Sequence, residues 1–157
     1  MITIGKYFLT HRARKVPSLP TRCNGLRGVQ LPNGNLLVCG GGGFDLIGSI
    51  VEGPACGEYL LLKAHSDQWT NVGTMKVARK YHTSVFYDGC LYTTGGLDSL
   101  NNVISHHEAF SLNGDVKEKK DMPIALQGHT ATIFDQHKML ICGGSKRKMQ
   151  NDVSKLG

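Results

Sequence analysis

Short apolar runs separated by turn residues cover most of the chain, and this pattern predicts β-strands. The predicted strands are Gly28–Leu31, Asn35–Cys39, Glu58–Lys63, Thr83–Tyr87, Cys90–Thr94, Val103–Phe110, Thr130–Phe134 and Lys138–Cys142, with two more through Trp69 and Val116. Between two of these runs stand Asp88 and Gly89. An Asp-Gly pair favours a two-residue hairpin, in which both residues take positive φ. The pattern therefore indicates an all-β fold of short antiparallel strands.

A double glycine closes a hydrophobic strand three times, at Gly40-Gly41, Gly95-Gly96 and Gly143-Gly144. A shift of 103 residues aligns Pro20–Gly41 with Pro123–Gly144 without a gap, and Cys39 then meets Cys142. The middle copy fits after a slip of one residue and places His82 level with His129. The glycine pairs are 55 and 48 residues apart, a period that favours propeller blades over most solenoids. Each copy is then a four-stranded meander, with strands a to d in chain order.

At these residues the sequence resembles the kelch repeat family. The resemblance rests on the three glycine pairs, on Trp69, on the stretch from Arg79 to His82, and on Asn101-Asn102-Val103 with its later counterpart Asn151-Asp152-Val153. It implies an all-β, kelch-type β-propeller, and it implies structural roles for the repeated residues. These are Gly40, Gly41, Gly95, Gly96, Gly143, Gly144, Trp69, His82 and His129.

The phase of the repeat divides the chain into two complete four-stranded blades and two half blades. We expect strands c and d of a half blade, with a basic N-terminal segment, in residues 1–19, and kelch repeats in 20–74, 75–121 and, truncated, 122–157. Joining the two halves would give three blades, whereas propellers have about four to eight. We therefore expect a fragment, a truncated gene product, or an assembly that shares blades between chains. Open sheet edges also favour self-association.

The net charge of +6 is not spread over the repeat. Six bases precede the first acid, Asp45, and the remaining 12 bases balance 12 acids, so we expect no nucleic-acid partner. The chain has no apolar run near 18 residues, and no membrane partner is expected. Five cysteines without a C-x-x-C spacing favour a reducing, cytoplasmic compartment. Residues 1–15 loosely resemble a mitochondrial presequence but are poor in serine, so a targeting role stays open.

Candidate catalytic chemistry is sparse, and we expect no catalytic, cofactor or metal site. His106 and His107 are neighbours in a strand and point to opposite faces. The four glycines Gly40–Gly43 are followed by Phe44 rather than by the Gly-Lys-Ser/Thr of a P-loop. Some kelch-like propellers are sugar epimerases or copper oxidases, so the enzyme class stays open as an alternative, beside a non-functional degenerate paralogue.

The connections after the glycine pairs differ most between copies, and loops on a rigid scaffold usually carry recognition. The candidate partner-binding residues are Phe44, Asp45, Leu46, Asp98 and Arg147. The resemblance implies a protein–protein interaction module, of the kind found in ubiquitin-ligase adaptors and actin-associated proteins. No BTB, BACK or F-box segment is visible in these residues, so the ligase role is an expectation about a longer polypeptide. The sequence predicts another protein as the partner.

Overall fold

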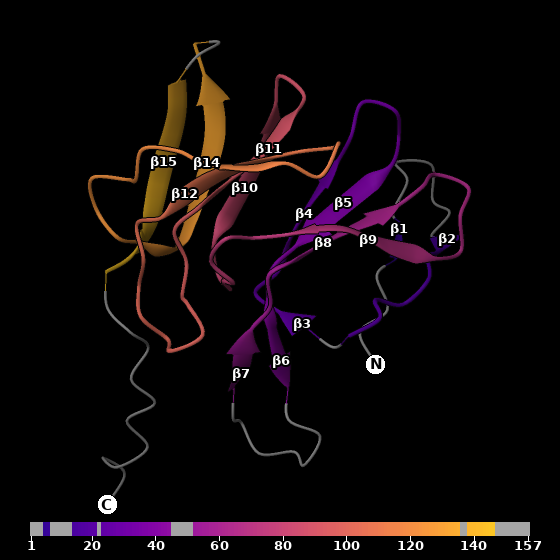
Figure 1. Ribbon diagram of the computed structural model, residues 1–157, viewed down its shortest axis with the longest axis horizontal. Coiled ribbons are helices and arrows are strands. Elements are labelled where there is room, and N and C mark those ends of the chain that lie inside the picture. Colours follow the sequence, from indigo (N-terminus) through magenta and orange to yellow (C-terminus); the bar gives the residue numbers. More distant parts are fainter. Residues whose placement is uncertain (1–4, 7–13, 22, 45–51, 136–137, 147–157) are drawn as a thin grey trace, which may run out of the picture.

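The computed structural model describes residues 5–6, 14–21, 23–44, 52–135 and 138–146, and in these ranges all regular structure is β-strand (Figure 1). The strands are β1 (Gly5–Lys6), β2 (Arg14–Lys15), β3 (Cys23–Asn24), β4 (Arg27–Gln30), β5 (Leu36–Cys39), β6 (Gly42–Phe44), β7 (Glu52–Ala55), β8 (Glu58–Leu62), β9 (Trp69–Thr74), β10 (Thr83–Tyr87), β11 (Cys90–Thr94), β12 (His107–Ser111), β13 (Val116–Glu118), β14 (Gln127–Phe134) and β15 (Lys138–Ser145). The described part of the chain therefore contains no helix that could cross a membrane.

Two four-stranded antiparallel meanders form the body of the molecule. Blade 1 has the order β4-β5-β8-β9, and blade 2 has the order β10-β11-β12-β13. Two hairpins are half blades: β1-β2 near the N-terminus and β14-β15 near the C-terminus. The first strands of successive blades are neighbours, since β10 packs against both β4 and β14. The predicted fold class, a partial propeller with two complete and two half blades, is confirmed.

The strand boundaries agree with the sequence pattern most closely in blade 2. Thr83–Tyr87 and Cys90–Thr94 are β10 and β11, and the turn between them has φ of 46° at Asp88 and 76° at Gly89, as an Asp-Gly hairpin requires. The third strand begins later than predicted, because Val103 forms only an isolated bridge with Leu97.

Two expectations about the glycine pairs need correction. The stretch Gly42–Gly57, expected as a loop, contains the hairpin β6-β7, and β3 adds a third strand to it. The last glycine pair does not end its strand, since β15 pairs with β14 as far as Ser145. Both differences arise because the backbone resumes antiparallel pairing beyond the glycines, which short apolar runs do not reveal.

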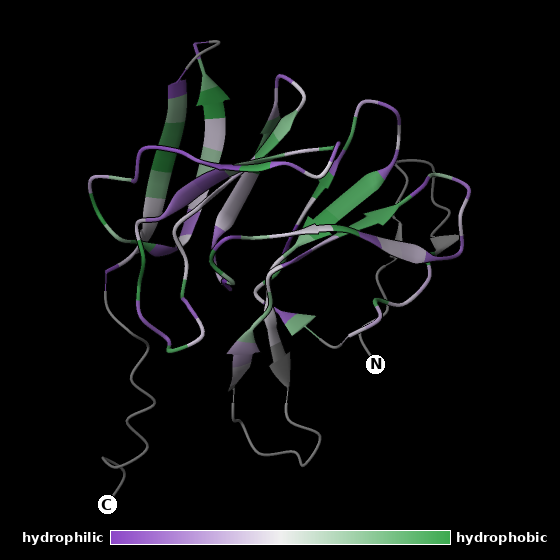
Figure 2. Ribbon diagram, viewed as in Figure 1, coloured by the Kyte–Doolittle hydropathy of each residue, from purple (hydrophilic) through white to green (hydrophobic). Residues whose placement is uncertain are grey.

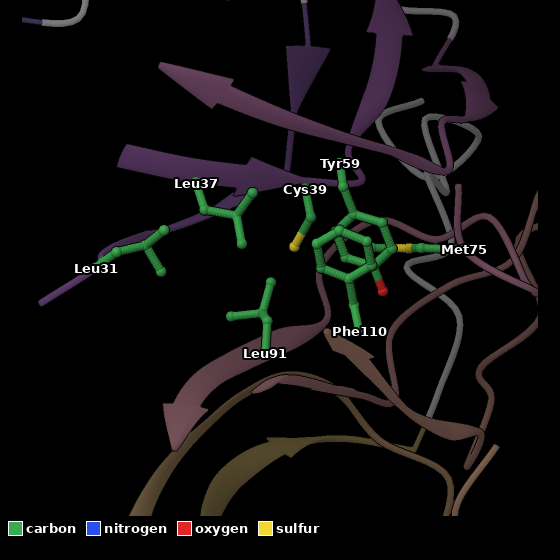
Figure 3. Close-up of a cluster of buried hydrophobic side chains, with 7 residues drawn as sticks. All are labelled: Leu31, Leu37, Cys39, Tyr59, Met75, Leu91 and Phe110. Atoms are coloured by element: carbon green, nitrogen blue, oxygen red, sulfur yellow. The ribbon is translucent and has the colours of Figure 1, made fainter. Parts of the chain in front are cut away.

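The hydrophobic core fills the space between blade 1 and blade 2 (Figure 3). Leu31, Leu37, Cys39 and Tyr59 come from blade 1, Leu91 and Phe110 come from blade 2, and Met75 comes from the link between them. The rings of Tyr59 and Phe110 stack with centroids 4.0 Å apart and an interplanar angle of 11°. Figure 2 shows the hydrophobic residues that run along β5 and β8 into this space. Burial of apolar surface between sheets thus holds the two blades together.

The first glycine of the first two pairs receives the histidine of the next blade. A Cβ added at Gly40 would lie 2.5 Å from Cε1 of His82, and one added at Gly95 would lie 2.6 Å from Cε1 of His129. Their φ values, 62° and 64°, are in the left-handed region that side chains disfavour. Glycine is therefore needed here both for the turn and for the close approach of the next blade.

Backbone hydrogen bonds repeat at each junction between blades. Tyr81 N–H donates to Gly25 C=O, and Gly128 N–H donates to Tyr81 C=O, each at 2.8 Å. All three residues have φ in the left-handed region, with 60° at Gly25, 55° at Tyr81 and 64° at Gly128. The second glycine of a pair makes a further hydrogen bond to the next blade. Gly41 N–H donates to Arg79 C=O at 2.9 Å, and Gly96 N–H donates to Leu126 C=O at 2.8 Å. We call this set of contacts, with the glycine–histidine packing, the blade joint.

Candidate functional site

A buried ion pair lies between blades 1 and 2. The Arg79 guanidinium and the Glu108 carboxylate are fully buried, with Nη2 3.2 Å from Oε2. Arg79 Nη1 also donates to His106 C=O at 2.7 Å, and its Nε donates to Val77 C=O at 3.0 Å. Burial lowers the pKa of Arg79, and the Glu108 charge opposes this shift. A buried guanidinium is tolerated here because nearly all of its N–H groups donate hydrogen bonds to protein oxygens.

Glu108 joins three segments of the chain. Its Oε1 accepts a hydrogen bond from Tyr59 Oη of blade 1 at 3.0 Å, and its Oε2 accepts one from Lys76 N–H at 3.2 Å. Burial raises the pKa of Tyr59, and the neighbouring Glu108 charge raises it further. The hydroxyl therefore stays protonated and acts as a donor. Because every group contacts protein, this arrangement fixes the angle between the blades rather than presenting reactive groups.

His82 is held neutral at the joint. Its Nε2 lies 3.4 Å from Cys39 Sγ of blade 1, and the ring is fully buried. Burial, and then the Arg79 charge, lowers the pKa of His82 to about 3. Burial also raises the pKa of Cys39 to about 12, so that thiol is a packing group rather than a nucleophile.

The neutral state of His82 should make the fold sensitive to acid. The unfolded chain takes up a proton near pH 6.5, whereas the folded chain does so only near the lowered pKa of about 3, so stability falls as pH drops below 6.5. From pH 7 to pH 5 we expect His82 to contribute a loss of about 2 kcal/mol in the free energy of unfolding. Urea unfolding at both values measures this. Replacement by leucine, the residue at the equivalent position 26, should remove that part of the loss, and an unchanged pH dependence would contradict the assignment.

Two of the predicted partner-binding residues, Phe44 and Asp98, lie in the part of the chain that the structure describes. The chain leaves β5, β11 and β15 towards the lower side of Figure 1, where the β6-β7 hairpin projects from blade 1. Phe44 is the last residue of β6 and pairs with Glu52 of β7. Asp45, Leu46 and Arg147 lie outside the described residues. The structure thus places Phe44 at the end of a projecting strand and does not test the other three.

Asp98 belongs to the equivalent connection of blade 2. Its Oδ1 accepts from the N–H groups of Leu100 and Asn102 at 2.9 and 2.8 Å, and its Oδ2 accepts from Asn102 Nδ2 at 3.0 Å. The carboxylate therefore organises its own loop, as in an Asx turn. Leu100, beside it, is 76% exposed and is the most exposed large apolar side chain of the described residues. The sequence analysis did not name Leu100. An apolar residue in a short polar loop could have indicated an exposed side chain at this position.

Some repeat residues make contacts that their spacing in the sequence does not reveal. Trp69 Nε1 donates to Pro17 C=O at 3.1 Å and so fixes the segment that enters blade 1. Glu108 and Tyr59 belong to no motif that the sequence analysis recognised. Their importance depends on the contact between two blades, because Tyr59 and Glu108 are 49 residues apart in the chain.

Titratable residues of the described ranges gather at one small hollow, which Cys23, Cys39, Cys56 and Glu58 help to line, and burial raises the pKa of the Cys23 thiol to about 11. Three or more potential metal ligands are nowhere in those ranges close enough to share an ion. A hollow between blades 1 and 2 is lined by Gln30, Leu31, Pro32, Gly34 and Phe86, and none of these is an acid, a base or a nucleophile.

Comparisons with known proteins agree with this architecture. No family model matches the chain. It is 33% identical to beta-scruin of Limulus polyphemus over 85 residues and 28% identical to alpha-scruin of the same organism over 79 residues, half of this chain in each case but 9% of either relative. The solved structure of YjhT matches 82% of this chain and 36% of that chain, with a TM-score of 0.63 and 20% identity. The chain is thus similar to kelch-repeat proteins, and it has the fold of a partial kelch-type β-propeller.

Proposed function

We propose that this chain is a protein-interaction module that binds another protein through the connections that follow its glycine pairs. The observation that carries the proposal is the β6-β7 hairpin, which extends blade 1 beyond the blade joint on the side where the other such connections emerge. A projecting hairpin whose first strand ends on an apolar residue, here Phe44, is suited to contacting a protein surface.

The scaffold beneath the hairpin is rigid, which favours binding. Cys56 N–H donates to Gly41 C=O at 2.6 Å, and Gly41 in turn donates to Arg79 C=O. The base of the hairpin is therefore tied both to its own glycine pair and to blade 2. A preorganised base lowers the entropy cost of binding, since less ordering remains when the partner arrives.

The double replacement of Phe44 and Leu46 by serine should remove partner binding. Each apolar anchor that is lost from the centre of an interface costs about 2 kcal/mol or more, so the two together should weaken binding by about 1,000-fold. The measurement is a pull-down with the immobilised chain, with bound proteins identified by mass spectrometry. Co-sedimentation with actin filaments tests the actin-associated class directly.

A matched control lies on the opposite side of the blade. Leu112 is 44% exposed in the turn between β12 and β13, and antiparallel connectivity places that turn at the other end of the strands from the hairpin. Leu112→Ser should leave binding unchanged, and both variants should keep the β-type circular dichroism of the parent. Retained binding by the Phe44 and Leu46 variant would show that the hairpin is not the interface.

The finer role is proposed from the family resemblance alone. An actin-associated protein and the substrate-recognition part of a ubiquitin-ligase adaptor both use a propeller to hold another protein. Partners from the pull-down separate the two, because a ligase adaptor should retain its substrate and an actin-associated chain should retain filaments. We also propose a reducing, cytoplasmic setting, in which the five thiols stay free as they are here.

A further inference from the structure

Two cysteines flank the glycine run on one face of the small sheet β3-β6-β7 (Figure 1). Cys23 of β3 pairs with Gly43, and the N–H of Cys56, directly after β7, donates to Gly41 C=O at 2.6 Å. Residues that face each other across strands, or that lie two apart along one strand, point to the same face of a sheet. The two cysteine side chains therefore share a face, on either side of the central segment 41–43.

The central segment carries no side chain on that face. Its two positions there are Gly41 and Gly43, so nothing stands between the flanking cysteines. A Cβ added at Gly41 would lie 3.1 Å from Cβ of Cys23, which is closer than carbon atoms of side chains normally approach. Cys23 thus leans over the central segment, into space that a side chain at position 41 would fill.

The two thiols meet over the glycines. The outer strands of a flat three-stranded sheet lie roughly 10 Å apart, which is too far for a disulfide. Here the Cys23 and Cys56 thiols are hydrogen-bonding neighbours, and both residues line one small hollow together with Gly40 and Glu58. Each cysteine is also partly exposed. The pair is therefore close enough to form a bond and open enough to meet a small reagent.

Blade 2 carries no thiol at the equivalent positions. Its second glycine, Gly96, accepts a hydrogen bond from Ile104 N–H at 3.0 Å, which is the contact that Cys56 makes in blade 1. Arg79 takes the place of Cys23, one residue before the backbone carbonyl that approaches the second glycine in each blade. The repeat thus requires a thiol at neither position, and the cysteine pair is particular to blade 1.

We propose that Cys23 and Cys56 form a reversible disulfide, which ties β3 to the end of β7 when a disulfide oxidant such as glutathione disulfide is present. The bond would close the base of the β6-β7 hairpin with a covalent link beside its backbone pairing. Excess glutathione would return both thiols. This inference does not rest on the proposed function, because the bond forms or fails to form whether or not the hairpin binds a partner.

The reaction balances as two thiol–disulfide exchanges. The Cys56 thiolate attacks one sulfur of glutathione disulfide, a bond forms between that sulfur and Cys56 Sγ, and the other glutathione leaves with the proton that Cys56 released. The Cys23 thiolate then attacks Cys56 Sγ, the bond to glutathione breaks, and the second glutathione leaves with the proton of Cys23. Two protein thiols and one glutathione disulfide thus give one protein disulfide and two glutathione molecules.

The surroundings of Cys23 assign it the second exchange. Burial, and then the neighbouring Cys56 and Glu58, raise the pKa of the Cys23 thiol to about 11. Because the thiolate is the attacking form, Cys23 reacts slowly with an oxidant from solution. Once Cys56 carries glutathione, the target sulfur is held beside Cys23, and this proximity favours the attack. Cys56 therefore takes the oxidant and Cys23 completes the disulfide.

The first test is peptide mass spectrometry of the full chain after incubation with glutathione disulfide. Tryptic peptides 23–27 and 28–63 should be joined, with the loss of two hydrogen atoms, and dithiothreitol should separate them. Since Cys39 is also in the second peptide, Cys56→Ser identifies the partner and should abolish the link. Cys142→Ser is the matched control: it removes an exposed thiol elsewhere and should keep the link. No link in the parent chain, or a link that survives Cys56→Ser, would overturn the proposal.

The second test examines the order of the two exchanges with single serine variants. Cys23→Ser should trap glutathione on Cys56 as a stable mixed disulfide, because the thiol that would displace it is gone. Cys56→Ser should take up glutathione at Cys23 about tenfold more slowly, since a raised pKa leaves less thiolate and greater nucleophilicity recovers only part of the rate. Equal rates of uptake by the two variants would overturn the assigned roles.

The third test asks whether the fold itself brings the thiols together. Disulfide formation at equilibrium in glutathione buffers is measured for the folded chain and for the chain unfolded in urea. A disulfide that suits the fold stabilises it, and by linkage the same factor favours its formation in the folded chain. We expect that factor to be about 100-fold. Equal formation in the two states, or less in the folded chain, would mean that the fold does not place the thiols together and would overturn the proposal.

Discussion

Gly40→Ala should lower the free energy of unfolding by about 3 kcal/mol, from the strain of a left-handed alanine and from overpacking together. The added methyl group would lie 2.5 Å from both Arg79 O and Cε1 of His82. One of these is backbone and the other is a fully buried ring, so neither can move away without opening the joint. Urea unfolding at one fixed protein concentration measures the loss, and thermal unfolding should show a melting point lower by about 10 °C.

Gly89→Ala separates the two causes. Its φ of 76° is as unfavourable for alanine, but nothing lies within 4 Å of the added Cβ, so only the conformational strain of about 1 kcal/mol should remain. The difference between the two variants is then the cost of crowding at the joint. If both lost the same free energy, close approach of the blades would not be the reason for glycine at position 40.

Glu108→Leu should cost about 3 to 5 kcal/mol, because it leaves the Arg79 guanidinium buried without its acid. The same change removes the acceptor for Tyr59 Oη and for Lys76 N–H. Urea unfolding again measures the loss, and the near-ultraviolet circular dichroism of the stacked Tyr59 and Phe110 should change with it.

A second replacement distinguishes an unpaired charge from a simple packing defect. Arg79→Met combined with Glu108→Leu removes both charges and should recover a large part of the loss, since apolar residues of similar volume can replace a buried pair. Glu108→Leu and the double variant differ only at position 79, which makes them a matched pair. A double variant less stable than Glu108→Leu would mean that Arg79 contributes mainly through its bonds to His106 and Val77 carbonyls.

The repeat and the strands of the fold could be predicted because their causes are local. Asp88 and Gly89 determine their hairpin, and the spacing of the glycine pairs determines the blade. The start of β12 at His107 and the course of β15 through Gly143 could not be predicted in this way, because pairing across the sheet decides both. Local propensity gives way to such contacts between strands.

The partner-binding residues remain a prediction from the sequence. Phe44 is the last residue of β6, in a connection that was expected as a loop and is a hairpin. Asp98 is a candidate partner-binding residue, and its carboxylate accepts three hydrogen bonds from its own loop. The importance of Glu108 and Leu100 depends on burial and exposure, which follow from how the blades pack rather than from residue type.

The blade joint also bears on how such a chain can change during evolution. Its hydrogen bonds join main-chain atoms, from Gly128 to Tyr81 and from Tyr81 to Gly25, so they constrain backbone conformation and not side-chain identity. Leucine at position 26 in place of histidine, and tyrosine at position 81 in place of glycine, are both accommodated. A duplicated blade can therefore dock on its neighbour at once and diverge afterwards, which allows new binding connections to arise on an unchanged frame.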